Sequence, residues 1–432
     1  MRLFVIGSDV PHREDGQAGV SAVNIVLHEL LRSLRGLGHE VALQLLFNSH
    51  RVADALTPRE SAELAHLAAQ GIAVLPPVVS APRVSPARPR FHLRMRLEEF
   101  YPAVKLRALV RSRVLEQRAE AVVTVWSPEG VAAVHGLDDV PIIAYHGDVD
   151  FMPQAARLHD RRLFAGDHGA LEWARLLLRR LELAQFKRAH LALMRHVDVV
   201  ANVTASNAEF YRRRGHPRSL YIPNTWSDIG VSSNGSPHNG TSSTGPRRPI
   251  HIIGHVGHLG RTGSAYGLHY LLTGVMPALQ TRMMGLDYRV HIIGEGQAAP
   301  SLRPLLCHER IVLHGFADDL DRELRHSDLF LLLNNAGAYQ AAFTRHIIAW
   351  SMGLCLVVHA KSRQAIPEIA HMENALIGGT PSEIAEMVFR AATNPELNER
   401  IRRGGRATYE RRFRPAAVAQ ALSDEIARAV AG

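Results

Sequence analysis

Cysteine is nearly absent from this chain of 432 residues, which contains only Cys307 and Cys355. Two cysteines in unrelated sequence contexts exclude a disulfide framework and a Cys-X-X-Cys metal site. No uninterrupted apolar run approaches the roughly 18 residues that a membrane-spanning helix needs. The N-terminal MRLFVI also meets a glycine and an aspartate too soon for a signal peptide. We therefore expect a protein of the cytoplasm, which is a reducing compartment.

Acidic residues are fewer than basic ones, with 41 Asp and Glu against 50 Lys and Arg and a net charge of +9. Such an excess attracts polyanions, which include nucleic acid, anionic lipid and phosphorylated small molecules. The basic residues are spread over helical patterns with apolar faces, and this distribution argues against nucleic acid. The hydrophobic content of 46% and the chain length are typical of a packed globular protein with two domains.

Residues 1–229 alternate between apolar runs and helical patterns, as expected for an open, doubly wound parallel α/β sheet. The predicted strands of this first domain lie at 2–6, 41–47, 121–125, 141–145 and 197–203. A helical pattern at 23–34 separates the first two strands.

Residues 230–249 are rich in Ser, Gly, Asn and Pro, which predicts a linker or loop. The α/β alternation then begins again. The predicted strands of the second domain, residues 250–432, lie at 250–253, 290–293, 311–313, 329–333 and 354–359. Residues 381–431 have a helical pattern without a strand, so we expect them to wrap the outside.

The candidate binding sites are the loops that follow strands, because ligands of open parallel sheets bind beyond the carboxyl ends of the strands. In the first domain, the loop 15–21 contains Gly16 and Gly19 before a helix. These glycines allow a phosphate to approach backbone N–H groups, although a plain strand-to-helix turn has the same sequence features.

In the second domain, residues 254–263 contain four glycines and Arg261, the composition of a phosphate cradle with a cation. His255 and His258 lack a third metal ligand at a supporting spacing, so no metal is expected. Residues 294–299 match the dinucleotide fingerprint Gly-X-Gly-X-X-Ala, but no acidic residue ends the strand that follows. An NAD-dependent enzyme is the alternative that this match supports.

The polar loop 334–346 lies between a predicted strand and a helix that runs to Gly353. Thr344, Arg345 and His346 fall at or near the N-terminus of that helix, where they and the backbone N–H groups can converge on a diphosphate. A polar cap on a buried helix would explain Thr344, but not an arginine where the helix dipole disfavours cations. This loop is the best candidate anion site in the chain.

His146 follows a first-domain strand in the turn Tyr145-His146-Gly147-Asp148. We expect it to face the cleft between the domains, where it acts as a base or binds a phosphate or a hydroxyl. A structural role is the alternative, because the chain contains 25 histidines.

Two basic segments alternate with apolar residues. Residues 88–118 contain nine Arg and Lys against three Glu, and a second group lies between Arg175 and Arg188. This pattern is typical of a helix on an anionic membrane surface. Ordinary solvated arginine faces explain it equally well.

A series of short motifs runs in order along the whole chain. The motifs are the first glycine-bearing loop with Gly-His-Glu at 38–40, Val-Asp-Val-Val-Ala-Asn at 197–202 with Ser206, Tyr-Ile-Pro-Asn at 221–224, Gly-His-Leu-Gly-Arg at 257–261, Ile-Ile-Gly-Glu-Gly at 292–296, His-Gly-Phe at 314–316 with Asp-Asp-Leu at 318–320, and Ile-Pro-Glu-Ile at 366–369 with Asn-Ala-Leu at 374–376. With these motifs the chain resembles the GT-B retaining glycosyltransferases of the glycosyltransferase 4-like group. The resemblance implies two Rossmann-like domains that face each other across a cleft, with a nucleotide-sugar donor on the second and the acceptor on the first.

The resemblance also implies roles for individual residues. It places the loop with Gly16 and Gly19 at the donor diphosphate, makes Arg261 the phosphate cation, and makes His146 the catalytic cleft histidine near the transferred sugar. Glu368, in the last group of motifs, is a further predicted donor contact.

The chain departs from the family at the donor site. The two glutamates of the family fall on Gln340 and Ile348, and the lysine before the glycine of the first helix is replaced by Tyr266. Gln340 carries no charge, and Ile348 cannot form a hydrogen bond with a ribose. We expect Gln340 to remain a donor contact and Thr344 with Arg345 to act as the local substitute, in which Arg345 supplies the missing cation.

The expected function is that of a hexosyltransferase that moves a sugar from a nucleotide diphosphate-sugar to a glycan or lipid-linked acceptor, in the synthesis of cell-surface polysaccharide or glycolipid. No cofactor or metal is expected, because cations and helix dipoles can neutralise the leaving diphosphate. The expected location is the cytoplasm, with peripheral contact to the inner face of the membrane. A non-catalytic GT-B-like protein that binds sugars or partners is the alternative, which the replaced glutamates favour.

Overall fold

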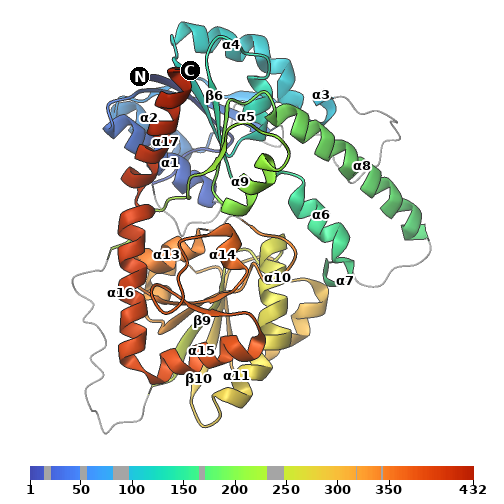
Figure 1. Cartoon of the computed structure of the whole chain (residues 1–432), viewed down its shortest axis with the longest axis vertical. Coiled ribbons are helices and arrows are strands. Elements are labelled where there is room, and N and C mark those ends of the chain that lie inside the picture. The colour runs from blue at the N-terminus through green and yellow to red at the C-terminus, as the bar shows by residue number, and fades with distance from the viewer. Residues whose placement is uncertain are drawn as a thin grey trace.

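The computed structural model describes residues 1–13, 21–48, 56–80, 97–164, 171–230, 248–317, 319–341 and 344–432. These residues form two parallel-sheet α/β domains, one above the other in Figure 1. The predicted fold class is therefore confirmed. Of the predicted linker 230–249, residues 231–247 lie outside the described residues.

The first sheet has the strand order β3-β2-β1-β5-β6-β7-β8, with β4 paired to β2. Its strands are β1 (Arg2–Gly7), β2 (Glu40–Asn48), β3 (Ala73–Val74), β4 (Val78–Ser80), β5 (Ala121–Val125), β6 (Ile142–His146), β7 (Val199–Asn202) and β8 (Ser219–Tyr221). In β1, Leu3 and Val5 pack into one core cluster, and Phe4 and Ile6 pack into another on the opposite face. A strand that is buried on both faces needs a continuous apolar run, and that run is the signal by which it was predicted.

Helical segments alternate with these strands along the chain. They are α1 (Ala22–Gly36), α2 (Pro58–Ala69), α3 (Leu97–Phe100), the 3-10 segment η1 (Pro102–Leu106), α4 (Arg107–Glu116), α5 (Pro128–Ala133), α6 (Met152–His159), α7 (Arg161–Phe164), α8 (Leu171–Met194) and α9 (Ala205–Arg212). The C-terminal helix α17 (Pro415–Val430) packs beside α1 (Figure 1). Ser423 in α17 has its Oγ 2.8 Å from Nε2 of His39, which follows α1. The last helix of the chain therefore covers the first sheet rather than the second.

The second sheet has the strand order β11-β10-β9-β12-β13-β14, and its pairings are parallel throughout the described residues. Its strands are β9 (Ile250–Val256), β10 (Tyr288–Ile293), β11 (Ile311–Gly315), β12 (Leu329–Leu332), β13 (Cys355–His359) and β14 (Leu376–Gly378). Its helical segments are α10 (Thr262–Tyr270), the π-type η2 (Leu271–Val275), α11 (Met276–Arg282), the 3-10 segment η3 (Pro300–Cys307), α12 (Leu320–Arg325), α13 (Arg345–Ser351), α14 (Ser362–Ala365), α15 (Pro381–Thr393) and α16 (Pro395–Arg412). Every strand predicted in either domain is present, with ends that differ by at most a few residues.

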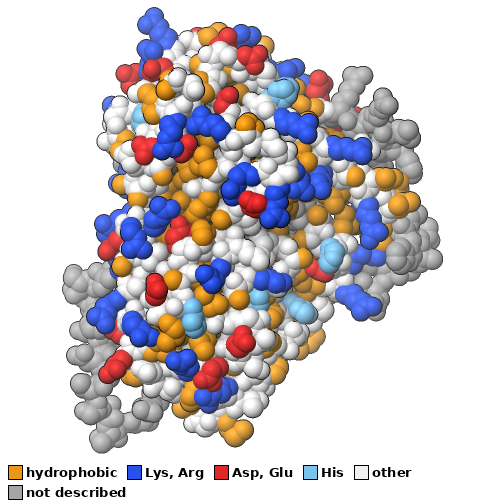
Figure 2. Space-filling view, in the orientation of Figure 1, with side chains coloured by type: hydrophobic (Ala, Val, Ile, Leu, Met, Phe, Trp, Pro, Cys, Tyr) orange, Lys and Arg blue, Asp and Glu red, His pale blue; other side chains and the backbone are white. Residues whose placement is uncertain are grey.

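The surface carries its basic residues on both domains. Figure 2 shows Lys and Arg side chains over the upper and lower halves of the face in view, mixed with acidic and apolar ones. No helix in the described ranges has the length and the apolar character that crossing a bilayer requires.

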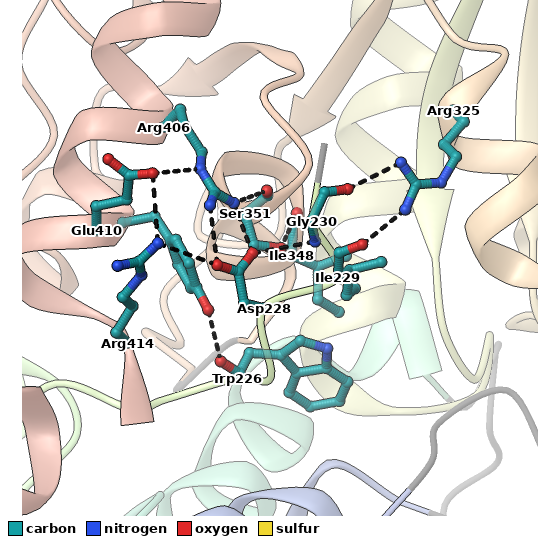
Figure 3. A network of polar contacts seen from close by, with 11 residues as sticks. Trp226, Asp228, Ile229, Gly230, Arg325, Ile348, Ser351, Arg406, Glu410 and Arg414 are labelled. Carbon is teal, nitrogen blue, oxygen red and sulfur yellow. Dashed lines mark hydrogen bonds and ion pairs between the residues drawn. The ribbon is translucent and has the colours of Figure 1, made fainter. Parts of the chain in front are cut away.

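The chain leaves the first domain through a segment that α16 holds in place (Figure 3). The Asp228 carboxylate in this segment accepts hydrogen bonds from Arg406 at 2.6 and 2.8 Å and from Arg414 at 3.2 Å. Tyr409 donates a hydrogen bond to the Trp226 carbonyl at 3.0 Å. The Arg406 guanidinium holds the pKa of Asp228 below its usual range. These contacts of Asp228 and Trp226 with Arg406, Tyr409 and Arg414 fix the point at which the chain crosses between the domains, and we refer to them as the clamp.

Apolar packing accompanies this clamp. Ile222 and Trp226 from the crossing segment lie in the same core cluster as Phe413 and Val418 from the end of α16 and the start of α17. This cluster reaches both sheets, so one side of the molecule has a continuous core across the two domains.

Candidate functional site

The carboxyl end of β9 and the N-terminus of α10 form the centre of the candidate site. Arg345, the first residue of α13, donates a 3.2 Å hydrogen bond from Nη2 to the Ser264 Oγ in the first turn of α10. Gly257 has a φ of +110°, and a Cβ at this position would lie 2.8 Å from Nη2 of Arg345. A side chain at position 257 would therefore displace the guanidinium.

Arg261 brings a second guanidinium to the same place. It is the N-cap residue of α10 and is exposed. Burial and the neighbouring Arg261 charge lower the pKa of Arg345 to about 9. Two cations thus meet at a helix N-terminus, where the dipole also disfavours positive charge. A diphosphate would relieve this repulsion and accept charge-assisted hydrogen bonds from both side chains.

The first domain reaches this helix terminus through α6. Arg157 donates from Nε to Thr262 Oγ1 at 2.9 Å and from Nη2 to the Gly260 carbonyl at 3.1 Å. Tyr266, one turn further along α10, donates its hydroxyl hydrogen to the carboxylate of Asp160, which follows α6. Figure 1 shows α6 and α7 beside α10. The two domains are therefore in direct contact at the predicted donor site.

A second contact joins the turn that contains His146 to the loop after β12. The Tyr339 hydroxyl donates a hydrogen bond to the Asp148 carboxylate. The structure therefore brings together the two segments that the sequence pointed to as candidate sites in the two domains.

The loop between β12 and α13 contains several unsatisfied polar groups. Asn334 and Asn335 are buried, and Nδ2 of each lacks a hydrogen-bond partner among the described residues. Gln340 donates to the Asn335 carbonyl at 3.3 Å, and the structure shows no partner for its Oε1 within the described chain. Thr344 is buried at the N-cap of α13 without a capping bond from its side chain. Buried polar groups normally have partners, so this loop marks a place where a polar ligand would supply them.

His146 is the last residue of β6 and is 2% exposed. Its ring lies 5.7 Å from the His190 ring and 6.2 Å from the Tyr211 ring. Its Nε2 has no hydrogen-bond partner in the described part of the chain. Burial lowers the pKa of His146, so its imidazole is neutral near pH 7. A neutral ring can donate a hydrogen bond but cannot supply a charge.

The wall behind His146 is a network of hydrogen bonds. His190 has its Nδ1 2.9 Å from Tyr101 Oη and its Nε2 2.6 Å from Tyr211 Oη. Tyr101 also donates to Asp150 at 3.1 Å. This network fixes the aromatic surface against which the His146 ring packs.

Glu368 lies at a separate contact between the domains. Its carboxylate accepts a 2.8 Å hydrogen bond from the Tyr221 hydroxyl in β8, and Nη2 of Arg412 lies 3.4 Å away. The described contacts thus give Glu368 a bridging role. Its role in donor binding stays a prediction.

Two residues of α13 point into the core. Ile348, at the position of the second family glutamate, is 5% exposed within an apolar cluster. His346 was expected near the anion, but its ring packs 5.4 Å from the rings of both Trp350 and Phe413. Burial lowers the pKa of His346 to about 3. Successive helical residues point in different directions, which is why Arg345 faces α10 and His346 does not.

Gly294, Gly296 and His255, which the sequence placed in candidate loops, have packing contacts. A Cβ on Gly294 would collide with the Gly257 backbone, and a Cβ on Gly296 would collide with the His258 ring. His255 is buried, with Nε2 3.1 Å from the Gly257 carbonyl oxygen. Nowhere in the described ranges do three His, Cys, Asp or Glu side chains gather in a way that could hold a metal ion. The predicted first-domain loop with Gly16 and Gly19 lies outside the described residues.

Sequence reasoning missed Arg157 and Asp160, and it assigned no role to Asp148 and Tyr339 although both lie in candidate loops. Arg157 is one of 50 Lys and Arg, and no local pattern distinguishes it from the others. Its partner Thr262 is 105 positions away in the chain. Tyr266 was noted as a replacement, but the sequence offered no signal for its contact with Asp160.

Residues 250–394 match the model of a protein family described as "Glycosyl transferases group 1". No curated protein matches the chain significantly in sequence.

Solved structures share the fold over almost the entire chain. The Anabaena protein Alr3699/HepE in complex with UDP-glucose is 14% identical, with a TM-score of 0.60 and coverage of 99% of this chain and 100% of that one. Sucrose-phosphate synthase from Thermosynechococcus elongatus is 12% identical, with a TM-score of 0.61 and complete coverage of both chains. The lipopolysaccharide outer core galactosyltransferase WaaB is 12% identical, with a TM-score of 0.56 and coverage of 99% of each chain. The chain therefore has the GT-B fold, with a second domain that is similar in sequence to group 1 glycosyl transferases.

Proposed function

We propose that the chain is a glycosyltransferase that moves a sugar from a nucleotide diphosphate-sugar to an acceptor hydroxyl. The observation that carries this proposal is the pair of guanidinium groups, from Arg261 and Arg345, at the N-terminus of α10 where the first domain makes contact. The sequence match of residues 250–394 supports the proposal independently.

The chemistry follows from the charge that develops during transfer. The bond between the anomeric carbon and the β-phosphate oxygen breaks. The acceptor oxygen bonds to that carbon and passes its proton to the departing phosphate oxygen. Negative charge grows on the leaving diphosphate, where Arg261, Arg345 and the N–H groups of α10 stabilise it. Because these groups take the place of a divalent cation, we propose a metal-independent reaction. We propose that the neutral His146 donates a hydrogen bond to the transferred sugar.

The finer assignments are also proposals. A hexosyl donor, retention of configuration and a glycan or lipid-linked acceptor follow from the motif resemblance. The surface of α8 supports a membrane-bound acceptor, because Leu177 and Leu181 are 61% and 53% exposed beside the exposed Arg179 and Arg180. Such a surface suits peripheral attachment at an anionic leaflet on the cytoplasmic side.

A non-catalytic GT-B-like protein is the second candidate. Ile348 is buried in the core and Gln340 is uncharged, so neither residue offers the carboxylates expected of the family. A protein of this kind would bind a nucleotide or sugar without breaking the glycosyl–phosphate bond.

The test combines binding with turnover. UDP, GDP, ADP and their glucose conjugates are screened by thermal shift, because a ligand that binds only the folded state raises Tm in a concentration-dependent way. The nucleotide-sugar that binds is then incubated with the protein, and free nucleoside diphosphate is measured. We expect a shift and diphosphate release, with the anomeric configuration of the product read by NMR. A shift without release supports the non-catalytic candidate, and no shift with any nucleotide contradicts the proposal.

A further inference from the structure

The contact between α6 and α10 contains a cation that the proposed function has not yet used. Arg157 is exposed, although it donates two hydrogen bonds to the start of α10, from Nε to Thr262 Oγ1 and from Nη2 to the Gly260 carbonyl. A guanidinium has five N–H donors. Two of these donors are engaged, so three remain for a ligand at the N-terminus of α10.

The start of α10 carries positive charge from both Arg157 and Arg261. Arg261 lies in sequence between Gly260 and Thr262, the two partners of Arg157. Among the described residues, no carboxylate is bonded to Arg157 or Arg261. Asp160 accepts a hydrogen bond from Tyr266 and lies 2.8 Å from Nδ1 of His159, and Asp148 accepts a hydrogen bond from Tyr339. Positive charge is therefore concentrated at the positive end of a helix dipole.

Tyr266 explains how α6 comes to lie there. In the motif resemblance this position is a lysine, which would put a cation on α10 itself. Tyr266 instead donates its one hydroxyl hydrogen to the Asp160 carboxylate, and its Oη also lies 3.3 Å from the Ala156 carbonyl oxygen. Ala156 and Asp160 lie on either side of Arg157 in the sequence. The residue that replaces the lysine thus anchors the helix that carries another cation to the same end of α10.

We infer that Arg157 is a ligand of the donor diphosphate supplied by the first domain, and that Tyr266 is a positioning residue that holds it there through Asp160 and Ala156. This inference rests on the proposed function. Its ligand is the diphosphate group, whichever nucleoside and sugar it carries. Because Arg157 belongs to the first domain and Arg261 and Arg345 to the second, both domains hold the diphosphate, and its binding strengthens the contact between them.

The test measures phosphate-dependent affinity. UDP, GDP and ADP, each with its nucleoside, are titrated calorimetrically into the parent protein, into Arg157→Ala and into Arg162→Ala. The last variant removes the same charge from an exposed position in α7. We expect Arg157→Ala to weaken diphosphate binding about ten- to a hundredfold, while nucleoside binding and Arg162→Ala stay near the parent values. Arg157→Lys should recover part of the lost affinity. Lysine keeps the positive charge but lacks the planar guanidinium that can donate two parallel hydrogen bonds.

A purely structural role for Arg157 gives a different result. In that case Arg157→Ala lowers Tm, and any loss of affinity is the same for the nucleoside as for the diphosphate. That outcome, or a diphosphate affinity equal to the parent's, overturns the inference while leaving the proposed function intact. A parent protein that binds none of the three diphosphates overturns the proposed function itself.

The positioning role of Tyr266 is tested by a double-mutant cycle. Tyr266→Phe removes only the hydroxyl, and we expect it to weaken diphosphate binding several-fold in the parent. In the Arg157→Ala background the same change should have almost no further effect, because Tyr266 acts through Arg157. Effects on diphosphate affinity that simply add would contradict this role.

Discussion

At the scale of single residues, the guanidinium of Arg345 carries the clearest prediction. Its replacement by alanine removes a charge-assisted hydrogen bond to the diphosphate, which costs about 1.5–3 kcal/mol of binding, or roughly ten- to a hundredfold in Kd. We expect the same for Arg261→Ala. Isothermal titration with the nucleoside diphosphate that the parent binds measures both effects.

Arg363→Ala is the matched control for these variants, because Arg363 is an exposed arginine of the same domain in α14. The affinity of Arg363→Ala for the nucleoside diphosphate should equal that of the parent protein. Arg345 also contacts Ser264 and the Gly257 loop, so Tm is recorded for each variant. A folded Arg345→Ala protein that binds as tightly as the parent would show that Arg345 does not touch the diphosphate.

His146 is predicted to act in transfer rather than in folding. Because it is neutral and its Nε2 has no partner in the described chain, its alanine variant should lose turnover more than donor affinity. We expect kcat to fall at least tenfold while the Kd for the nucleotide changes little. Kinetics per folded molecule, with Tm measured in parallel, provide the check.

His190→Ala is the comparison for His146. It removes the hydrogen bonds to Tyr101 and Tyr211, so it should lower Tm clearly. If His146→Ala instead behaves like His190→Ala, with a lower Tm and near-parental turnover, His146 is a structural histidine.

The lowered pKa of His291 predicts that the free energy of unfolding falls in acid. Its Nε2 lies 2.9 Å from Nδ1 of His251, and its Nδ1 lies 2.8 Å from Nε2 of His314, across three neighbouring strands. Burial, and then the charges of His251 and His314, lower the pKa of His291 to about 4. The folded-state value is below the unfolded one of about 6.5, so this contribution is complete above pH 6.5 and disappears as the pH falls toward 4.

The expected contribution is about 1–2 kcal/mol after allowance for solvent screening of this partly buried ring. Urea unfolding of the parent and of His291→Gln between pH 7 and pH 4 measures it. The variant should lose less stability over this range, because glutamine does not titrate. Parallel pH profiles for the two proteins would contradict the prediction.

At the scale of elements, the basic and apolar helices of the first domain predict reversible binding to anionic membranes. Of the segment 88–118, residues 88–96 lie outside the described residues, and the rest contains the exposed Leu109 and Leu115 in α4. The α8 helix adds Leu177 and Leu181 beside exposed arginines. Basic side chains near such a surface contribute about 1 kcal/mol each and are screened by salt.

Co-sedimentation with vesicles that contain phosphatidylglycerol or only phosphatidylcholine tests this surface. We expect binding to the anionic vesicles at low salt, loss of binding at high salt, and weaker binding of Leu177→Ser/Leu181→Ser. Met284→Ser is the control, because Met284 is 81% exposed in the other domain. Binding that ignores lipid charge and salt, or no binding at low salt, would exclude the prediction.

At the scale of the whole molecule, the clamp around Asp228 controls how the domains are joined. Asp228→Ala leaves Glu410 as the carboxylate that Arg406 and Arg414 share. Because the side chains are partly exposed, we expect a loss of only about 1–2 kcal/mol in the free energy of unfolding. Small-angle scattering should show a broader distribution of domain separations.

The exposed Asp424 of α17 is the control for this clamp, because Gln420 is its only side-chain partner among the described residues. Asp424→Ala should leave stability and scattering unchanged. If the Asp228→Ala protein is indistinguishable from the parent in both measurements, apolar packing alone is enough to fix the segment that crosses between the domains.

Local patterns were enough to predict the architecture. Strands such as β1 and β13 are buried on both faces, so each appears as a short apolar run that can be read without knowledge of the fold. The strands that were missed, such as β3 and β14, are two and three residues long, too short to show a pattern. Arg345 and Arg261 could be proposed because each follows a strand of a parallel sheet, where ligands bind.

The sequence by itself determined the two α/β domains, the positions of their main strands and the loops in which a phosphate site could lie, because burial and turn chemistry act between near neighbours in the chain. Only the tertiary structure decided that Arg157 meets the start of α10, that Tyr266 holds Asp160, and that Asp148 meets Tyr339. It also placed His346 in the core and α17 on the first sheet. These outcomes depend on how two separately folded sheets dock, and contacts between residues more than 100 positions apart leave no periodic trace in the sequence.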